Sequence, residues 1–367
     1  MTMAPKLLNP GPVTLTDRVR AAMGRPDLCH REPEFASLAL DVIARLGGVY
    51  GTAAGAHRAV LLTGSGTAAV EAMVGSLVPR EGRALVAANG VYGERIADML
   101  RAHGKAFDVA AAEWTAPIDL DAVEAQLATG LFSHVIAVHH ETTTGRLNDI
   151  DALGASCRHH GVALLLDAVS SFGGEEVKFD EWNLEACAAT ANKCLHGVPG
   201  ASFVMARADA FERPSGSPSV YLDLHRYRRA QETGYSPFTQ SPHVLYALDE
   251  ALAELADDGG WQARRSRYRA LTDRVRRGLT AIGVQPLLPA DVSSSMLTSY
   301  DLPAGASYDR LHDRLKDDGY VIYAGQGFLD GRIFRIAVMG DLDADDMDRV
   351  VESATHALAP VTAASAS

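Results

Sequence analysis

The sequence predicts an α/β protein built around a doubly wound, mainly parallel sheet, and three observations support this prediction. From about residue 58 onward, short runs of apolar residues recur along the chain. These runs lack the alternation of polar and apolar residues that a half-exposed strand shows, so they indicate strands buried on both faces of a sheet. Each run is followed by a stretch with helical periodicity, which is typical of repeated strand–helix units with parallel strands.

The predicted strands and helices alternate in a regular order. The first strand, RAVLLT, is followed by the amphipathic helix TAAVEAMVGSLV, and the same order then repeats. The predicted strands are 58–63, 83–89, 133–141, 162–169 and 185–193, and the predicted helices between them are 67–78, 94–104 and 149–161.

A change of organisation near residue 259 predicts a second domain. The turn residues DDGG end one helix, and a long, arginine-rich helix follows, whose arginines we interpret as a solvated face. We predict that residues 1–258 form an N-terminal segment and a large domain, and that residues 259–367 form a small α+β domain with a disordered tail. The small domain is predicted to contain strands in 293–300, 320–325 and 333–339, a helix near 306–318 and a last helix from Asp343.

Composition narrows the classes of function. The formal net charge of -12 and the pI near 5.5 argue against a nucleic-acid partner or a basic membrane-binding face. The start, MTMAPKLLNPGPV, has no apolar core of signal-peptide length, and the longest apolar runs, such as VALLL, are too short to span a bilayer. The four cysteines have no CxxC spacing, so neither a disulfide framework nor a zinc site is indicated. We expect a cytoplasmic protein that acts on small molecules without a metal.

Three motifs follow successive predicted strands, and the first is Thr63-Gly64-Ser65-Gly66-Thr67. Glycines allow the backbone to approach an anion closely, and the first N–H groups of a helix have no partner within the helix. The motif therefore suits a phosphate group, although an ordinary strand–turn–helix connection has the same composition. Neither a GxGxxG fingerprint nor a P-loop lysine is present, which disfavours a dinucleotide or a nucleoside triphosphate.

The second motif is Asp167, at the end of the run VALLLDAVSSFGG. A carboxylate at the C-terminal end of a buried parallel strand lies where open α/β sheets bind ligands. Asp167 could cap a helix, ligate a metal, or pair with a protonated ring nitrogen, and the last role would make a pyridinium an electron sink.

The third motif is Lys193, in the segment Ala191–Gly197 after the next apolar strand. A surface lysine at a strand end is one interpretation. A buried lysine with a lowered pKa is the other, and it would be a nucleophilic amine suited to Schiff-base chemistry. Lys193 and Asp167 are 26 residues apart (193 − 167), about one strand–helix unit, so both should project from the same edge of the sheet. Phosphate cradle, ring counter-ion and Schiff-base lysine together are the anchor points of pyridoxal phosphate.

At these motifs the chain resembles the fold-type I, class V aminotransferases, and the resemblance extends over nearly its full length. The best-matching segments are LLNPGPV, TGSGTAAVEA, NGVYGERI, HHETTTGRLNDID, LLLDAVSSFGG and ANKCLHGVPG. Within that class, ETTTG, DAVSSFGG and ANKCLHGVPG are most similar to the 2-aminoethylphosphonate–pyruvate aminotransferases. The resemblance implies a large domain that binds pyridoxal 5'-phosphate, a small C-terminal domain and a homodimer with the cofactor near the interface.

The resemblance also implies roles for individual residues. Lys193 would hold the cofactor as a Schiff base, and Asp167 would pair with its ring nitrogen. The other cofactor-binding residues would be Ser65, Gly66 and Thr67 at the phosphate, Tyr92 over the ring, Thr142 beside the ring oxygen, and Thr239, which would reach the phosphate across the dimer. The spacing around Thr239 departs from the usual pattern of the class, which leaves its position uncertain by one residue.

Two arginines are candidates for binding the acidic group of the substrate. Arg335 lies in the alternating strand IFRIA, where the class places an arginine that grips the acid, and a guanidinium fork suits a carboxylate or a phosphonate. Arg31 could act as a second donor or could pair with Glu32 or Glu34. Cys194 is expected to pack rather than react, and His139, His140 and His196 are expected to be structural.

The function that the resemblance implies is amino transfer between 2-aminoethylphosphonate and pyruvate, which yields phosphonoacetaldehyde and alanine, or the reverse. Two alternative reactions would use related chemistry, and one further alternative is not catalytic. Alanine–glyoxylate or serine–pyruvate transamination would place a carboxylate on Arg335, and elimination of ammonia from a hydroxylated aminophosphonate would start in the same way. A non-catalytic ligand-binding relative is disfavoured by the presence of both Asp167 and Lys193.

Overall fold

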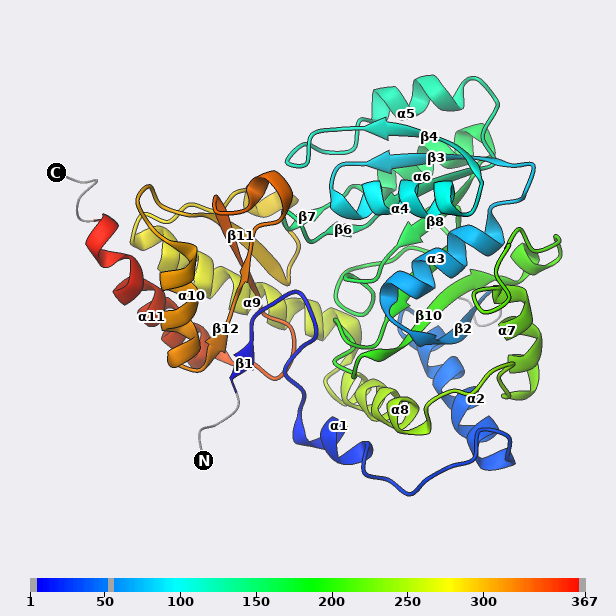
Figure 1. Cartoon of the computed structure of the whole chain (residues 1–367), viewed down its shortest axis with the longest axis horizontal. Helices are drawn as coiled ribbons and strands as arrows, with labels where there is room; N and C mark the ends of the chain where they lie inside the picture. The colour runs from blue at the N-terminus through cyan, green and yellow to red at the C-terminus, as the bar shows by residue number, and fades with distance from the viewer. Residues whose placement is uncertain (1–4, 52–55, 363–367) are drawn as a thin grey trace.

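The computed structural model describes residues 5–51 and 56–362. Its centre is a seven-stranded sheet in the order β2-β10-β9-β8-β5-β3-β4 (Figure 1). Strand β10 is antiparallel to both of its neighbours, and the other pairs of adjacent strands are parallel. The strands are β2 His57–Gly64, β3 Arg83–Ala88, β4 Ala106–Ala111, β5 His134–Val138, β8 Ala163–Asp167, β9 Leu184–Thr190 and β10 Gly200–Arg207. The predicted class, a doubly wound and mainly parallel α/β fold, is confirmed.

Helices cover both faces of this sheet. One apolar cluster joins one face to α2 Pro33–Gly48, α5 Leu120–Leu127, α6 Ile150–His160 and α8 Pro242–Asp257. A second cluster joins the other face to α3 Gly66–Leu77, α4 Val91–Ala102 and α7 Leu224–Ala230. Side chains of β5 alternate between the two clusters, with Val135 and Ala137 in the first and Ile136 and Val138 in the second. The absence of polar alternation in the sequence thus has a direct cause, since both faces are dry.

The helix ends follow local chemistry. Helix α6 begins after Asp149, whose side chain accepts a hydrogen bond from the amide of Ala152. It ends at Gly161, which adopts the left-handed conformation with φ of 66°. Short elements complete the large part of the chain: α1 Asp17–Ala22, the hairpin of β6 His140–Glu141 and β7 Arg146–Leu147, and the 3-10 turns η1 Ala208–Phe211 and η2 Gln231–Thr233.

The C-terminal part of the chain forms a second, smaller layer of sheet and helices (Figure 1). Its antiparallel sheet has the order β11-β14-β13. Its elements are α9 Gly260–Ala281, η3 Ala290–Val292, β11 Leu297–Asp301, α10 Tyr308–Asp317, β12 Tyr320–Val321, β13 Tyr323–Ala324, η4 Gly327–Leu329, β14 Ile333–Ala337 and α11 Ala344–Thr362. Within the described residues, no helix is both long and apolar enough to cross a bilayer. The predicted disordered tail, residues 359–367, is wrong for residues 359–362, which belong to helix α11, and residues 363–367 are outside the described residues.

One arginine of the long helix is not solvated. Arg264 is 2% exposed and donates hydrogen bonds from Nη1 to the backbone carbonyls of Cys194 (3.0 Å) and Leu195 (3.4 Å). Its Nη2 bonds to Asp258 at 3.0 Å. The interpretation of the arginines as a solvated face is therefore wrong for Arg264. Its hydrogen bonds instead hold the loop that carries Lys193.

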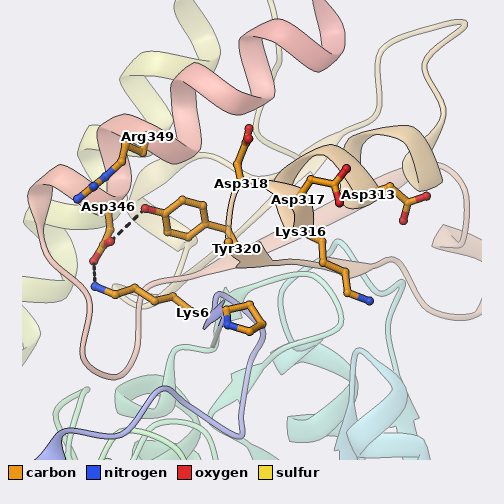
Figure 2. Close-up of a pocket in the computed structure, with 10 residues that line it drawn as sticks. Lys6, Asp313, Lys316, Asp317, Asp318, Tyr320, Asp346 and Arg349 are labelled. Atoms are coloured by element: carbon orange, nitrogen blue, oxygen red, sulfur yellow. Dashed lines mark hydrogen bonds and ion pairs between the residues drawn. The ribbon is translucent and has the colours of Figure 1, made fainter. Parts of the chain in front are cut away.

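The N-terminal segment packs against the C-terminal part of the chain, where Lys6–Leu7 and β12 form a two-stranded sheet of their own. Strand β1, Lys6–Leu7, pairs in parallel with β12. Figure 2 shows Lys6 and Tyr320 converging on Asp346 of α11 at the edge of a surface pocket, with Lys6 Nζ at 2.6 Å and Tyr320 Oη at 3.1 Å from its carboxylate. Asp346 also accepts a hydrogen bond from the amide of Asp343 at 3.0 Å. None of the residues that line this pocket is among the predicted site residues.

We expect Asp346→Ala to destabilise the protein by about 1–3 kcal/mol, because it leaves three donors without their acceptor. Burial raises the pKa of Asp346, but the hydrogen bonds from Lys6 and the Asp343 amide outweigh it and hold the pKa below its ordinary value. A carboxyl group with a lowered folded-state pKa stabilises the fold above its unfolded pKa, and this stabilisation disappears as the pH falls through the folded pKa. Urea denaturation should therefore show a difference between wild type and variant that is large at neutral pH and shrinks in acid. Lys6→Ala, which removes one partly exposed partner, should cost less than about 1 kcal/mol.

Candidate active site

The predicted site residues gather at one edge of the large sheet because of its topology. Strands β2, β3, β5, β8 and β9 all run in the same direction, so their carboxyl ends meet at that edge. The phosphate-cradle motif follows β2, Tyr92 follows β3, Thr142 follows β5, Asp167 ends β8, and Lys193 follows β9. In the sheet register Asp167 lies opposite Ala188 of β9, which is only five residues before Lys193.

Lys193 is half-buried beside the N-terminal segment. Its Nζ donates a hydrogen bond to the backbone carbonyl of Pro10. A Cβ atom at Gly11 would lie 2.4 Å from Lys193 Cδ and 2.8 Å from Nζ, and Gly11 has φ of 103°, so both space and backbone conformation require glycine there. Burial lowers the pKa of Lys193 to about 8, although the nearby Asp167 opposes this shift.

Asp167 is a buried carboxyl group, 7% exposed. Its Oδ1 accepts a hydrogen bond from the amide of Val169 at 2.9 Å. Burial raises the pKa of Asp167 to about 6, while the Val169 amide, Arg95 and Lys193 act in the opposite direction. The group therefore lies in a dry environment in which a cationic partner would stabilise its ionised form.

The cradle motif lies at the N-terminus of helix α3. Ser65 is the N-cap residue, and its side chain accepts from the amide of Ala68 at 3.4 Å. Gly66 must lack a side chain, because a Cβ atom there would lie 2.6 Å from Val169. Ser65 and Thr67 are exposed, and the first turn of α3 contains no acidic residue. Free N–H groups at this helix end provide a site for an anion.

Tyr92 and Thr142 lie around a buried carboxyl group, Glu141. Tyr92 is in the first turn of α4, and its amide donates to Glu141 Oε2 at 3.2 Å. The guanidinium group of Arg95 lies 4.7 Å from the centre of the Tyr92 ring. Thr142 is 2% exposed, in the turn between β6 and β7.

Arg335 joins the small sheet to this turn. It is 2% exposed on β14, and it donates from Nε to the carbonyl of Ala324 and from Nη1 to the carbonyl of Thr142, both at 2.9 Å. Its guanidinium group also lies 5.9 Å from the centre of the Tyr323 ring. Burial lowers the pKa of Arg335, and the surrounding tyrosines and Glu141 oppose this shift. Arg335 thus remains a cation that is held in place by two carbonyls.

Two predicted residues are not brought into this group within the single chain. Arg31 is exposed in the connection between α1 and α2, and among the described residues it forms neither a hydrogen bond nor an ion pair, so its suggested pairing with Glu32 or Glu34 is not observed. Thr239 is exposed between η2 and α8. The next residue, Gln240, bonds to the carbonyl of Leu61 in β2 at 3.2 Å, which holds this segment near the strand that leads into the cradle.

The histidines and Cys194 are buried. Burial is the main cause that lowers the pKa of His139 to about 3 and that of His140 to about 4, and it also lowers the pKa of His196 far below its ordinary value. His196 Nε2 accepts from the amide of Gly340 at 2.9 Å, which ties the Lys193 loop to the small sheet. Burial raises the pKa of Cys194 to about 12, and its sulfur packs against Met339, so the structure agrees with packing rather than reactivity.

Sequence reasoning missed Glu141, Pro10 and Gly11. Glu141 ends an apolar run, and a carboxyl group in such a position is a detectable signal of a buried acid. The contact of Pro10 and Gly11 with Lys193 joins residues 183 positions apart, and no local pattern predicts it.

These residues fit pyridoxal phosphate. The N-terminus of α3 offers unpaired N–H groups for a phosphate, and the buried Asp167 carboxylate can pair with a ring cation. The half-buried amine of Lys193 belongs to the loop that follows β9, the strand paired with the one that Asp167 ends. Among the described residues, the buried His140 Nε2 has no hydrogen-bond partner, and Lys193 lowers the pKa of this histidine. An unpaired polar atom beside the amine is consistent with a place for a bound group.

Comparisons with known proteins agree with this fit. The family model for class V aminotransferases matches residues 51–325. A Pseudomonas putida protein named 2-aminoethylphosphonate–pyruvate transaminase is 36% identical over 365 residues, which cover 98% of each chain. A Burkholderia pseudomallei protein of the same name is 39% identical, with 96% of each chain covered.

Solved structures show the same relationship. An alanine–glyoxylate aminotransferase from Nostoc sp. superposes with a TM-score of 0.91 at 25% identity, covering 98% of this chain and 96% of that one. An aspartate aminotransferase from Thermus thermophilus superposes with a TM-score of 0.88 at 27% identity, covering 97% and 99%. The chain therefore belongs to the class V aminotransferases, a family of enzymes that use pyridoxal phosphate.

Proposed function

We propose that this aminotransferase transfers an amino group between 2-aminoethylphosphonate and pyruvate. The observation that carries the proposal is the similarity, over nearly the whole chain, to proteins of several bacteria that bear this name. The buried cation Arg335 supports it, because both amino donor and keto acid have an acidic group that a guanidinium fork can bind.

We propose the following cofactor contacts. Lys193 would attach the cofactor, Asp167 would pair with its ring nitrogen, and Tyr92 would cover the ring with Thr142 beside it. The amides and hydroxyls of Ser65, Gly66 and Thr67 would hold the phosphate. When bound, the cofactor supplies an electron-withdrawing ring that stabilises negative charge on the carbon bearing the amino group.

The residues of the chain would then perform three tasks. Asp167 provides an anion that is shielded from water, and this anion favours the protonated form of the ring nitrogen with which it would pair. Arg335 holds the acidic end of the substrate and so orients the carbon that loses a proton. Lys193 Nζ accepts this proton and returns it, a role for which a pKa near 8 is suitable because a large part of the amine is neutral near that pH.

A second candidate is alanine–glyoxylate transamination, which the resemblance to the Nostoc enzyme favours. The two candidates differ in the acid that Arg335 binds. A phosphonate has three acceptor oxygens, whereas a carboxylate has two, so a site adapted to the phosphonate leaves donors unpaired with the smaller acid.

The proposed domain division places the boundary near residue 258, although Lys6–Leu7 pairs with β12 of the C-terminal part. Cytoplasmic location is also proposed, supported by the absence of disulfides among the four cysteines, all of which lie in the described part of the chain.

Lys193→Met should abolish transamination and should prevent borohydride from fixing pyridoxal phosphate covalently to the protein. Mass spectrometry of the reduced protein measures this directly. Lys105→Met is the matched control, because Lys105 is buried, at 6% exposure, and burial lowers its pKa to about 8, as it does for Lys193. Lys105 donates to the carbonyls of Val78 and Gly216 and should affect stability but not cofactor attachment. Covalent attachment to the Lys193 variant would show that another lysine carries the cofactor.

The wild-type enzyme should have a higher kcat/KM for 2-aminoethylphosphonate with pyruvate than for alanine with glyoxylate or serine with pyruvate. Arg335→Lys keeps the charge but loses the fork, and it should reduce kcat/KM for the phosphonate and for pyruvate together by about tenfold to a hundredfold. Arg332→Lys, at an exposed position just before the same strand, is the control and should behave as wild type. A preference for alanine with glyoxylate would instead establish the second candidate.

We further propose a two-fold homodimer in which Thr239 reaches the partner's cofactor phosphate. Val220 is 59% exposed and Tyr221 43% exposed, and Tyr221 donates to the carbonyl of Thr63 beside the cradle. The Tyr221 ring also contacts Phe238, the neighbour of Thr239. Exposed apolar groups next to a site are a common mark of an interface.

Light scattering should give about twice the chain mass of 39.0 kDa. Val220→Asp should shift the enzyme toward monomer and weaken its retention of pyridoxal phosphate. Leu131→Asp, at a position that is 65% exposed between α5 and β5, should do neither. A fully active wild-type monomer would refute the dimer.

A further inference from the structure

Glu141 is a buried carboxyl group that the proposed chemistry does not use. Its exposure is 0%, and among the described residues it forms no ion pair. Burial raises the pKa of Glu141 to about 7, although hydrogen bonds from Thr143 and from the Tyr92 amide oppose this shift. A buried carboxyl group destabilises the fold unless hydrogen bonds compensate for its lost hydration. The partners of these hydrogen bonds therefore indicate the role of Glu141.

One carboxylate oxygen of Glu141 caps helix α4. The N-cap residue of α4 is Gly90, which has no side chain to accept from the first turn. Oε2 of Glu141 accepts from the amide of Tyr92 at 3.2 Å and so replaces the missing cap. An added Cβ at Gly90 would lie 2.3 Å from Cδ, 2.4 Å from Cγ and 2.5 Å from Oε2 of Glu141, so the glycine provides the space that this carboxyl group fills.

The other oxygen holds the turn between β6 and β7. Oε1 accepts from the hydroxyl of Thr143 at 2.6 Å and from its amide at 3.2 Å. The carbonyl of Glu141 accepts from the amide of Gly145 at 2.8 Å, which closes the turn. Thr142 lies between these bonds, and its carbonyl is the acceptor for Nη1 of Arg335 at 2.9 Å.

We propose that Glu141 is a positioning residue that sets the place of Tyr92 and that of Arg335 together, through one oxygen each. The proposal rests on the proposed function, in which Tyr92 covers the cofactor and Arg335 binds the acid of the substrate. A single side chain, bonded to Tyr92 and Thr143, would thus link cofactor binding to substrate binding.

Glu141→Gln tests this link. An amide has one acceptor oxygen, so either the Tyr92 amide or Thr143 must face an NH₂ donor. We expect KM for both pyruvate and 2-aminoethylphosphonate to rise by about tenfold or more, and kcat to fall by less than about threefold. Pyridoxal phosphate should bind the apoenzyme about tenfold more weakly, and hydrogen exchange at the Tyr92 amide in the apoenzyme should accelerate.

The matched control is Glu185→Gln. Glu185 is 2% exposed on β9 of the same sheet, and it accepts from Nε2 of His134 at 3.3 Å and from Arg213 at 2.5 Å. This variant should lower thermal stability and leave KM, cofactor affinity and exchange at Tyr92 unchanged. Equal effects of the two variants on KM would mean that Glu141 only stabilises the fold, which would overturn the proposal.

A double-mutant cycle with Gly90 tests the geometry. Gly90→Ala should displace the Glu141 side chain and reproduce the rise in KM, because the three nearest atoms to the new methyl group all belong to Glu141. In a Glu141→Ala background these atoms are absent, so Gly90→Ala should add less than about a twofold further effect. Additive effects would show that Gly90 and Glu141 act separately.

A milder variant guards against misfolding. Thr143→Val removes one hydroxyl and should raise KM severalfold while leaving exchange at the Tyr92 amide at the wild-type rate. An unchanged KM in this variant would contradict the role of Oε1. If the proposed function is wrong, the wild-type enzyme will have no activity on the phosphonate. The faster hydrogen exchange at the Tyr92 amide of the Glu141→Gln variant would still be observed in that case. An active wild type whose Glu141→Gln variant keeps normal KM, cofactor affinity and exchange refutes the positioning role alone.

Discussion

The site depends on one constraint: its ionisable side chains are shielded from water at one edge of the large sheet. Asp167 is buried and Lys193 is half-buried there, and burial moves the pKa of the acid up to about 6 and that of the amine down to about 8. Each charge opposes the pKa shift of the other group, so the two groups stabilise one another's charged forms. Such a pair can be held only where strands end side by side, because Asp167 ends β8 and Lys193 follows its neighbour β9.

The remaining structure keeps that edge covered. The N-terminal segment pairs with β12 and brings Pro10 to the amine. Arg264 donates to the carbonyls of Cys194 and Leu195, and His196 accepts from the amide of Gly340 in the C-terminal part of the chain. The loop that carries Lys193 is therefore held from several sides, as a precisely placed functional group requires.

This arrangement brings together ionisable side chains whose burial is energetically unfavourable. Glu141, Asp167 and Arg335 are nearly inaccessible to water and Lys193 is half-buried, and isolated buried charges are unfavourable. Their compensation comes mostly from backbone groups: carbonyls for Lys193 and Arg335, and amides for Asp167 and Glu141. Backbone partners are immobile, so these side chains are oriented before any ligand arrives.

The sequence by itself determined the α/β class, five of the seven strands of the large sheet, and the placement of Asp167 and Lys193 after successive strands, because apolar runs and turn residues are local signals. Strand β10 was missed, since its antiparallel direction depends on pairing with β2 and β9 rather than on its composition. Burial of Arg264 was missed because a helix periodicity does not say which loop packs against it.

Only the tertiary structure placed Pro10 beside Lys193 and Glu141 between Tyr92 and the turn that holds Arg335. These contacts join segments that are 49 to 193 residues apart in the chain, and long-range contacts leave no periodic trace in a sequence. Residue type can reveal what chemistry a chain carries, whereas the distances that let those groups act together are decided by how the sheet and its loops pack.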